Sequence, residues 1–469
     1  MVSKIKNEII IVIITVFLSM MVFGNIDFQT QQASSKTNVA TSSPQSSSNN
    51  NSHVLPVSLG TQVTVGKGNI SATAIDHNTG RIYAIYYNTK NNSTNLFLTH
   101  SDDNGKTFSP AVRVNDIAGD ASADDSSPPV IKVASNGDVY VSWIYSDYAN
   151  KWMHRFAYGY ATIRVAHSSD GGQTFGKAAH VDTEEYGTWA QYAHDIGISP
   201  DGKTAYVAWI NSNGAGKEPN FNDIIMIAKS TDGAKTFGKA VPVDGQHTAC
   251  SCCKVNIATG KDGSVYVSWR KLYQAPESQH VPPTDVDYAY RQIVVAKSID
   301  GGQTFAAPVK VYDDKFLFNS CVMSGPQMAV DSKNNLHIVW YSGTNTTGFL
   351  PGSYYALSSD GGKSFGKPVP LVVGKKLGVN VEYMALDGND NSWIVWEDRS
   401  GQNNTMWMYN ELPPTKIAVA KITPDGKMTK TILDIGNGKL PGIIAYGDKV
   451  SIVWNTNNHT VKFASLAKA

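Results

Sequence analysis

Short runs that alternate β-branched and aromatic residues recur along most of the chain, and they come in pairs separated by a short turn. The second run of a pair usually ends in tryptophan, as in Val265-Tyr266-Val267-Ser268-Trp269. The seven pairs are 70–76 with 82–87, 130–134 with 139–143, 196–199 with 205–209, 255–259 with 265–269, 328–331 with 336–340, 384–387 with 393–396 and 443–446 with 450–454. This pattern predicts strands that are buried between packed sheets.

An eight-residue turn recurs between these pairs, with Ser298-Ile299-Asp300-Gly301-Gly302-Gln303-Thr304-Phe305 as its clearest copy. Four other copies begin at Ser101, Ser168, Ser230 and Ser358. Each copy lies between two strand-like runs, so we expect a hairpin in which the aspartate accepts backbone N–H groups and glycine supplies a positive φ. The aspartates with this structural role are Asp103, Asp170, Asp232, Asp300 and Asp360. Such repetition predicts an array of one supersecondary unit.

The pattern Ser-x-Asp-x-Gly-x-Thr, followed by an aromatic residue, resembles the Asp box, or BNR repeat, of sialidase-like β-propellers. In that superfamily the box is a structural turn on the face away from the ligand site. The resemblance therefore implies a fold rather than an activity. It is not a close match to a catalytic sialidase, because sialidases have six blades and usually carry an Arg-Ile-Pro segment before the first blade, which this chain lacks.

The order of the runs predicts how the propeller closes. Five pairs are followed by an Asp-box hairpin, the sixth by a degenerate hairpin at 417–433, and the seventh by a single run at 461–465. The run at 57–65 supplies the missing last strand, which removes the exposed edges of the sheet. We therefore predict an all-β, seven-bladed propeller of four-stranded antiparallel blades over residues 55–469, with six blades as the alternative.

The N-terminus predicts a location outside the cytoplasm. Lys4 and Lys6 precede an apolar run at 9–23, so residues 1–24 are predicted to be a signal peptide or an N-terminal membrane anchor. Residues 25–54 are rich in Ser, Asn and Gln and are predicted to be a disordered tether. Either reading gives a protein that is secreted or anchored to the cell surface, and it contacts a membrane only if the N-terminus is uncleaved.

Composition narrows the choice of partner. The formal net charge is +1, which argues against a nucleic-acid partner and against a polybasic membrane-binding surface. The longer loops all fall on the face opposite the Asp boxes, where binding usually resides. Their aromatic residues predict a surface for a glycan or a cell-surface protein, although the same residues would also pack the loops onto the blades. The candidate ligand-binding residues are Trp152, Tyr158, Trp189, Tyr273 and Trp407.

A hydrolytic activity is the alternative that the resemblance raises. A sialidase-like glycoside hydrolase needs three arginines that bind a carboxylate, a tyrosine activated by a glutamate, and an aspartate for acid–base chemistry. The weak candidates for such roles are Arg270, Arg291, Arg399, Glu382, Asp125 and Asp195. Each of them is also readily explained as a structural residue; Glu397-Asp398-Arg399, for example, reads as an ion-paired strand end.

The four cysteines form the most specific feature of the long-loop face. Cys250, Cys252 and Cys253 precede the innermost strand of blade four, and Cys321 precedes that of blade five, so their sulfurs are expected to converge. Disulfides are the favoured reading in an oxidising compartment. A copper or zinc site, with His247 as a further candidate ligand, is an alternative, and a free catalytic thiol is another. The leading functional prediction remains recognition of a glycan or protein through the long-loop face.

Overall fold

The computed structural model describes residues 53–468, except for 92, 124–126, 147–160, 182–189, 213–222, 247, 251–252, 277–288, 319–323, 345–348, 375–381 and 400–414. The predicted signal peptide or anchor, and almost all of the predicted tether, lie outside the described residues. Within the described residues, no helix has the length and apolar character needed to cross a membrane.

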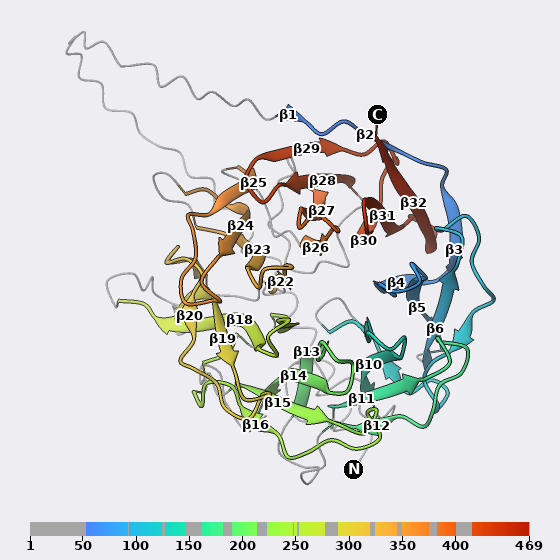
Figure 1. The fold of residues 1–469 in the computed structure, drawn as a ribbon, viewed down its shortest axis with the longest axis horizontal. Coiled ribbons are helices and arrows are strands. Elements are labelled where there is room, and N and C mark those ends of the chain that lie inside the picture. The colour runs from blue at the N-terminus through green and yellow to red at the C-terminus, as the bar shows by residue number, and fades with distance from the viewer. Residues whose placement is uncertain are drawn as a thin grey trace, which may run out of the picture. The chain divides into compact units, whose positions relative to one another are not determined.

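The described chain forms seven antiparallel blades arranged around a central channel, as the sequence predicts (Figure 1). Blade one contains β4 (Asn69–Ile75), β5 (Ile82–Lys90), β6 (Ser93–Ser101) and β7 (Val112–Arg113). Blade two contains β8 (Ala121–Ser122), β9 (Val130–Val133), β10 (Val139–Ser146), β11 (Ala161–Ser168) and β12 (Ala179–His180). Blade three contains β13 (Ala190–Ile198), β14 (Ala205–Ser212), β15 (Ile224–Ser230) and β16 (Val241–Pro242). Blade four contains β17 (Asn256–Thr259), β18 (Val265–Gln274), β19 (Ala289–Ser298), β20 (Val309–Lys310) and β21 (Leu317–Phe318).

Blades five to seven follow the same order. Blade five contains β22 (Gln327–Val330), β23 (Leu336–Ser342), β24 (Gly352–Ser358) and β25 (Val369–Val373). Blade six contains β26 (Glu382–Leu386), β27 (Ser392–Asp398), β28 (Lys416–Ile422) and β29 (Met428–Ile432). Blade seven contains β30 (Lys439–Tyr446), β31 (Lys449–Asn455) and β32 (Thr460–Lys468). The innermost strands β4, β9, β13, β17, β22, β26 and β30 contact one another in this order, and β30 contacts β4. The seven inner strands therefore close a ring around the channel.

The N-terminal segment closes the last blade, which confirms the predicted arrangement. β2 (Val57–Leu59) and β3 (Val63–Lys67) both pair antiparallel with β32, and Figure 1 shows the blue β3 beside the red β32. The sequence did not predict β1 (His53–Val54), which pairs parallel with β29 of blade six. The next residue, Leu55, is 5% exposed and packs with Trp393 and Ile443 between blades six and seven, so burial holds this extra strand in place.

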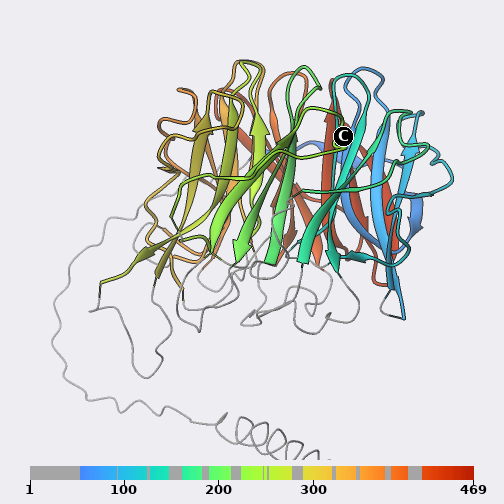
Figure 2. The ribbon, with the colours of Figure 1, turned by 90° about the horizontal axis from the view of Figure 1, so that it is seen from below.

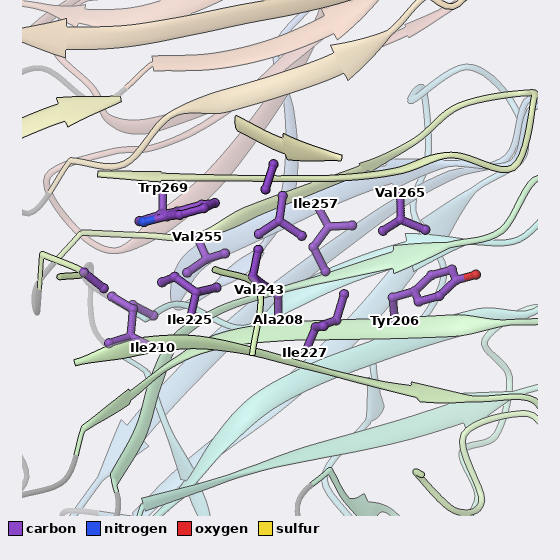
Figure 3. Packing of buried hydrophobic residues seen from close by; sticks show 14 of the residues in the cluster. Tyr206, Ala208, Ile210, Ile225, Ile227, Val243, Val255, Ile257, Val265 and Trp269 are labelled. Atoms are coloured by element: carbon purple, nitrogen blue, oxygen red, sulfur yellow. The ribbon is translucent and has the colours of Figure 1, made fainter. Parts of the chain in front are cut away.

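Apolar side chains fill the space between neighbouring blades. Figure 3 shows Ile210 and Ile225 of blade three facing Val255 and Trp269 of blade four. Six tryptophans at corresponding positions of the second strands are fully buried: Trp143, Trp209, Trp269, Trp340, Trp396 and Trp454. Burying each such side chain contributes on the order of 2–3 kcal/mol, so these layers stabilise the stack of blades.

The five repeated turns share one hydrogen-bond pattern. In the copy on blade four, the Ser298 hydroxyl donates to Asp300 Oδ1 at 2.7 Å, and the Thr304 N–H and hydroxyl donate to the two carboxylate oxygens at 3.0 and 2.5 Å. These donors lower the pKa of Asp300, and the same contacts lower the pKa of Asp103 to about 2. All five turns connect the third strand of a blade to the fourth, so they lie together on one face of the disc, opposite the ends where the inner strands begin (Figure 2). The aspartates therefore act as structural turn residues.

Candidate functional site: the mouth of the central channel

A cavity of about 170 Å³ occupies the end of the channel where the inner strands begin. Every one of the seven inner strands, or the residues directly before it, contributes to the wall. Its polar and aromatic lining residues include Ser71, Lys132, His194, Asp195, Lys254, Asn256, Gln327 and Tyr383. The cavity thus places polar groups from separate blades around one small space, at the face to which the longer loops connect.

Lys254 brings a buried positive charge to this cavity. The residue lies before Val255 and β17 of blade four and is 7% exposed. Its ammonium lies 3.4 Å from the hydroxyl of Tyr383 on β26 and 5.6 Å from the centre of the same ring. A carbon added at Gly325 would lie 2.1 Å from the backbone oxygen of Lys254, so the chain before β22 packs directly against it. The lysine is therefore held across the channel from blade four towards blade six.

Asp195, a predicted catalytic candidate, joins neighbouring inner strands. Its Oδ2 accepts hydrogen bonds from Asn256 Nδ2 at 2.6 Å and from Ile257 N at 2.9 Å, both on blade four. Burial raises the pKa of Asp195, and these donors oppose the rise. Asn256 in turn accepts the Met328 N–H at 2.8 Å, so the chain of hydrogen bonds extends to blade five. This geometry gives Asp195 a structural function at the channel wall.

His194 is the neighbouring titratable group. Its ring lies 3.0 Å from the Ser142 hydroxyl, and the side chain is fully enclosed. Burial, with a smaller contribution from nearby Lys254, lowers the pKa of His194 to about 4. The imidazole is therefore neutral near pH 7, and Lys254 and Lys132 supply the positive charge at this part of the cavity.

Two of the predicted catalytic arginines lie together, but their hydrogen bonds go to the protein. Arg270 is 1% exposed and donates to the carbonyl oxygens of Ser324, Arg291 and Tyr341 at 2.8–3.3 Å. Arg291 is 6% exposed and donates to Cys250 Sγ at 2.9 Å. Among the described residues that line the cavity, none is arginine. The pair thus fixes the ends of β18, β19 and β23.

The other two described catalytic candidates, Arg399 and Glu382, are also enclosed. Arg399 donates to Glu397 Oε2 at 2.6 Å, and Glu397 Oε1 accepts the Leu440 N–H, so this pair joins blade six to blade seven. Glu382 accepts a hydrogen bond from the Ser353 hydroxyl. Burial raises the pKa of Glu382 to about 7. Arg399 therefore lies apart from the pair formed by Arg270 and Arg291, on a different blade.

The two described cysteines lie beside Arg291. Cys250 and Cys253 are each 1% exposed, and their sulfurs lie 3.0 Å apart. Burial, followed by contact with Cys250, raises the pKa of Cys253 well above its ordinary value. The structure thus brings these two sulfurs together without a disulfide between them, and the predicted convergence of all four sulfurs stays a prediction. Cys252, Cys321 and His247 lie outside the described residues.

Of the aromatic candidates, only Tyr273 is described. Its ring lies 4.4 Å from the ammonium of Lys310 and 5.9 Å from that of Lys271, which pairs with Asp244 at 2.6 Å. Cations thus already contact this ring, which makes it part of a local cluster on blade four. Trp152, Tyr158, Trp189 and Trp407 lie outside the described residues, as does Asp125.

Sequence reasoning missed Lys254 and Tyr383. The position of Lys254, between the cysteine segment and a buried strand, could have marked it as a functional candidate. A lysine is almost never buried without a partner. The partner tyrosine is about 130 residues away in the chain and two blades away in the ring, so no local pattern links the two residues.

No protein-family model and no curated protein sequence matches this chain. Among solved structures, an ulvan lyase of polysaccharide lyase family PL25, bound to -[GlcA(1-4)Rha3S]-, is 9% identical over 86% of this chain and 95% of that chain, with a TM-score of 0.55. The Hadza microbial sialidase Hz136 is 12% identical over 80% and 74%, with a TM-score of 0.45. An α-L-arabinanase from Penicillium chrysogenum is 11% identical over 80% and 98%, also with a TM-score of 0.45. At such identities the likeness concerns the propeller fold alone.

Proposed function

We propose that this protein recognises glycans that carry carboxylate or sulfate groups, and that it binds them at the mouth of the central channel. The observation that carries this proposal is the buried ammonium of Lys254, whose described contacts are the hydroxyl and ring of Tyr383. An enclosed charge is costly without a counter-charge. An anionic group on a ligand would supply that counter-charge.

The rest of the cavity fits the same chemistry. Gln327 adds an amide group to the cavity that Lys254 lines, and Lys132 adds a second positive charge on the wall. Amides and hydroxyls hydrogen-bond sugar hydroxyls, and Tyr383 offers an aromatic ring for stacking. The cavity volume of about 170 Å³ suits one terminal sugar or its charged substituent rather than a long chain.

The wider assignment follows from the repeats and the N-terminus. We infer that the five repeated turns are Asp boxes and that the protein belongs among sialidase-like propellers. The apolar run at 9–23 and the polar segment after it support a site of action outside the cytoplasm, either secreted or anchored to the cell surface.

Recognition is a better-supported proposal than hydrolysis. A sialidase-type site needs arginine donors that are free to bind the carboxylate of a substrate. The donors of Arg270 instead reach three backbone carbonyls, and Arg399 pairs with Glu397. Both side chains are at most 1% exposed. Arg270 and Arg399 therefore brace the blades.

A glycan array that contains neutral, carboxylated and sulfated glycans tests the proposal. Calorimetry with glucuronate, and with acetate as the smallest carboxylate, shows whether the sugar ring contributes to binding. Lys254→Met removes the charge and keeps much of the apolar stem. Lys427→Met makes the same change at an exposed lysine on the opposite face and is the matched control.

The proposal predicts binding to acidic glycans, at least a tenfold loss with Lys254→Met, and no loss with Lys427→Met. Equal binding of acetate and glucuronate would show a simple anion site and overturn glycan recognition. Glycan recognition at this site would also be overturned if the array gave no acidic glycans, or if a folded Lys254→Met variant bound them fully. Release of free sugar that survives Lys254→Met but not Glu382→Gln would support the hydrolase instead.

A further inference from the structure

The wall of the channel cavity has a polar half and an apolar half. The polar half comes from blades two to five and includes Lys132, Asp195, Lys254, Asn256 and Gln327. The apolar half comes from blades seven and one and includes Ile70, Leu440, Pro441, Ile443 and Val453. The inner strands form a ring of seven, so the junction between blades seven and one lies opposite blade four; Figure 1 shows β30 and β4 across the channel from β18. An anion bound by Lys254 would therefore face apolar surface.

Leu440 gives the apolar half its local shape. It lies in a β-bulge of β30, where the register with β31 shifts between Lys439 and Gly442. Its φ is +50°, a left-handed conformation that bulky side chains rarely adopt. The Leu440 N–H donates to Glu397 Oε1 at 2.9 Å, and Arg399 donates to the other oxygen of that carboxylate at 2.6 Å. Blade six therefore holds the bulge of blade seven in this conformation.

The backbone at this position does not require a leucine. Glycine or asparagine adopts a positive φ at a lower cost. Leu440 and the next residue, Pro441, both line the cavity, and Leu440 packs against the cluster that contains Ile70 and Val453. Bulges and strained residues of this kind are enriched at ligand sites, where a bulge re-aims a side chain. The leucine thus contributes apolar surface to the cavity in spite of the strain. Leu440 and Pro441 are called the apolar ledge below.

The apolar ledge suits a methyl group better than an acetamido group. The Leu440 N–H already donates to Glu397, and proline has no N–H. The carbonyl oxygen of an acetamido group would therefore find no donor on the backbone of these two residues. A methyl group that is bonded directly to a sugar carbon or to an ether oxygen needs no such donor, and it gains free energy from burial alone.

We propose that the apolar ledge selects acidic sugars that carry such a methyl group, either as a 6-deoxy sugar or as a methyl ether. This inference rests on the proposed recognition of an anion at Lys254 and names the class of ligand for the same cavity. Lys254 binds the carboxylate or sulfate, and the ledge contacts the methyl group across the cavity. One buried methyl group should raise the affinity about fourfold.

Calorimetry with two matched pairs of ligands tests this selection. The pairs are glucuronate with 4-O-methylglucuronate, and D-galactose 3-sulfate with D-fucose 3-sulfate. The wild-type protein should prefer the methyl-bearing member of at least one pair by about fourfold or more. Equal affinities within both pairs would overturn this inference and leave the proposed recognition of acidic glycans intact. No binding of any of the four sugars would overturn both. Tighter binding of a 2-acetamido derivative of glucuronate than of the methyl ether would contradict the choice of methyl group.

A substitution that keeps the bulge assigns the preference to the ledge. Leu440→Asn replaces the apolar end of the side chain at similar size, and asparagine tolerates a positive φ. The variant should lose the preference and bind the sugar without the methyl group as wild type does. His459→Asn is the control, because His459 is exposed and has a φ of +54°. This control should keep the preference.

Two results with the variants would overturn the role of the ledge. One is a preference that survives in folded Leu440→Asn, and the other is an equal loss of affinity for both members of a pair. If Leu440→Asn does not fold, Leu440→Gly provides the same test, since glycine removes the side chain and accepts the positive φ without strain.

Discussion

The ring of Phe108 meets the ring of Phe463 edge-on, with centroids 5.4 Å apart. Phe108 ends the first repeated turn, on blade one, and Phe463 lies in β32 of blade seven. The two ends of the propeller therefore meet through an aromatic contact, in addition to the pairing of β2 and β3 with β32. Aromatic pairs in this geometry contribute about 0.5–1.5 kcal/mol beyond the area they bury.

Substitutions at the contact between blade one and blade seven should weaken the closure of the propeller. A carbon added at Gly105 would lie 1.9 Å from a ring atom of Phe463, and Gly105 has a φ of +81°. Gly105→Ala should therefore lower the free energy of unfolding by more than about 3 kcal/mol, comparable to Phe463→Ala. Gly426→Ala is the control, because its φ is +84° and an added carbon would meet no atom beyond its chain neighbours within 4 Å.

Denaturant unfolding of the three variants gives the comparison. Gly426→Ala should lower the free energy of unfolding only by the backbone strain at a positive φ, about 1–2 kcal/mol. Equal losses for Gly105→Ala and Gly426→Ala would show that the contact with Phe463 does not matter for closure.

The repeated turns should be structural in solution. Asp300→Asn removes an acceptor for the Ser298 and Thr304 hydroxyls, and Asp434→Asn makes the same change at an exposed aspartate outside the repeats. We expect a lower Tm for Asp300→Asn and an unchanged Tm for Asp434→Asn in differential scanning calorimetry. Glycan binding at 25 °C should be the same for both. A loss of binding without a loss of stability would instead place ligand contacts on the turn face.

Asp195 should stabilise the protein through its links to blade four. Asp195→Ala leaves the Asn256 amide and the Ile257 N–H without their acceptor inside the ring, and a buried donor left in this way costs about 1–3 kcal/mol. We expect the free energy of unfolding to fall by about 3 kcal/mol in urea, against little change for exposed Asp448→Ala. A fully stable Asp195→Ala variant that no longer binds ligand would argue for a functional role.

Glu382 should make stability depend on pH. Its pKa is raised by burial from 4.5 to about 7, so the folded protein holds the proton more tightly than the unfolded chain. The stability that this group contributes is fully present below pH 4.5 and is lost as pH rises through 7. Across this pH range the free energy of unfolding should fall by about 3 kcal/mol because of Glu382.

Glu382→Gln removes the titration and keeps the size of the side chain. The variant should therefore lose less stability than wild type between pH 5 and pH 8, as measured by urea unfolding at both pH values. An identical pH dependence in the two proteins would show that Glu382 has an ordinary pKa.

Sequence patterns predicted the fold because each blade is built from local signals. The paired apolar runs, the repeated turn and the run at 57–65 each specify their structure within a few dozen residues. β1 escaped prediction because it is only two residues long and is held by its pairing with β29 and by the burial of Leu55. The early start of β13 at Ala190 was missed for a similar reason, since a register shift between Tyr192 and Asp195 breaks its alternation.

The sequence by itself determined the number of blades, since turn chemistry and alternation act between near neighbours. It also determined the closure by the N-terminal strand, since the seventh unit lacks a last strand of its own. Only the tertiary structure decided which polar groups meet. Arg270 could have faced a ligand or a carbonyl, and Lys254 could have faced solvent. Ring closure brings Lys254 to Tyr383 and encloses Arg270 among backbone oxygens. Such pairings depend on contacts between blades, which no local pattern encodes.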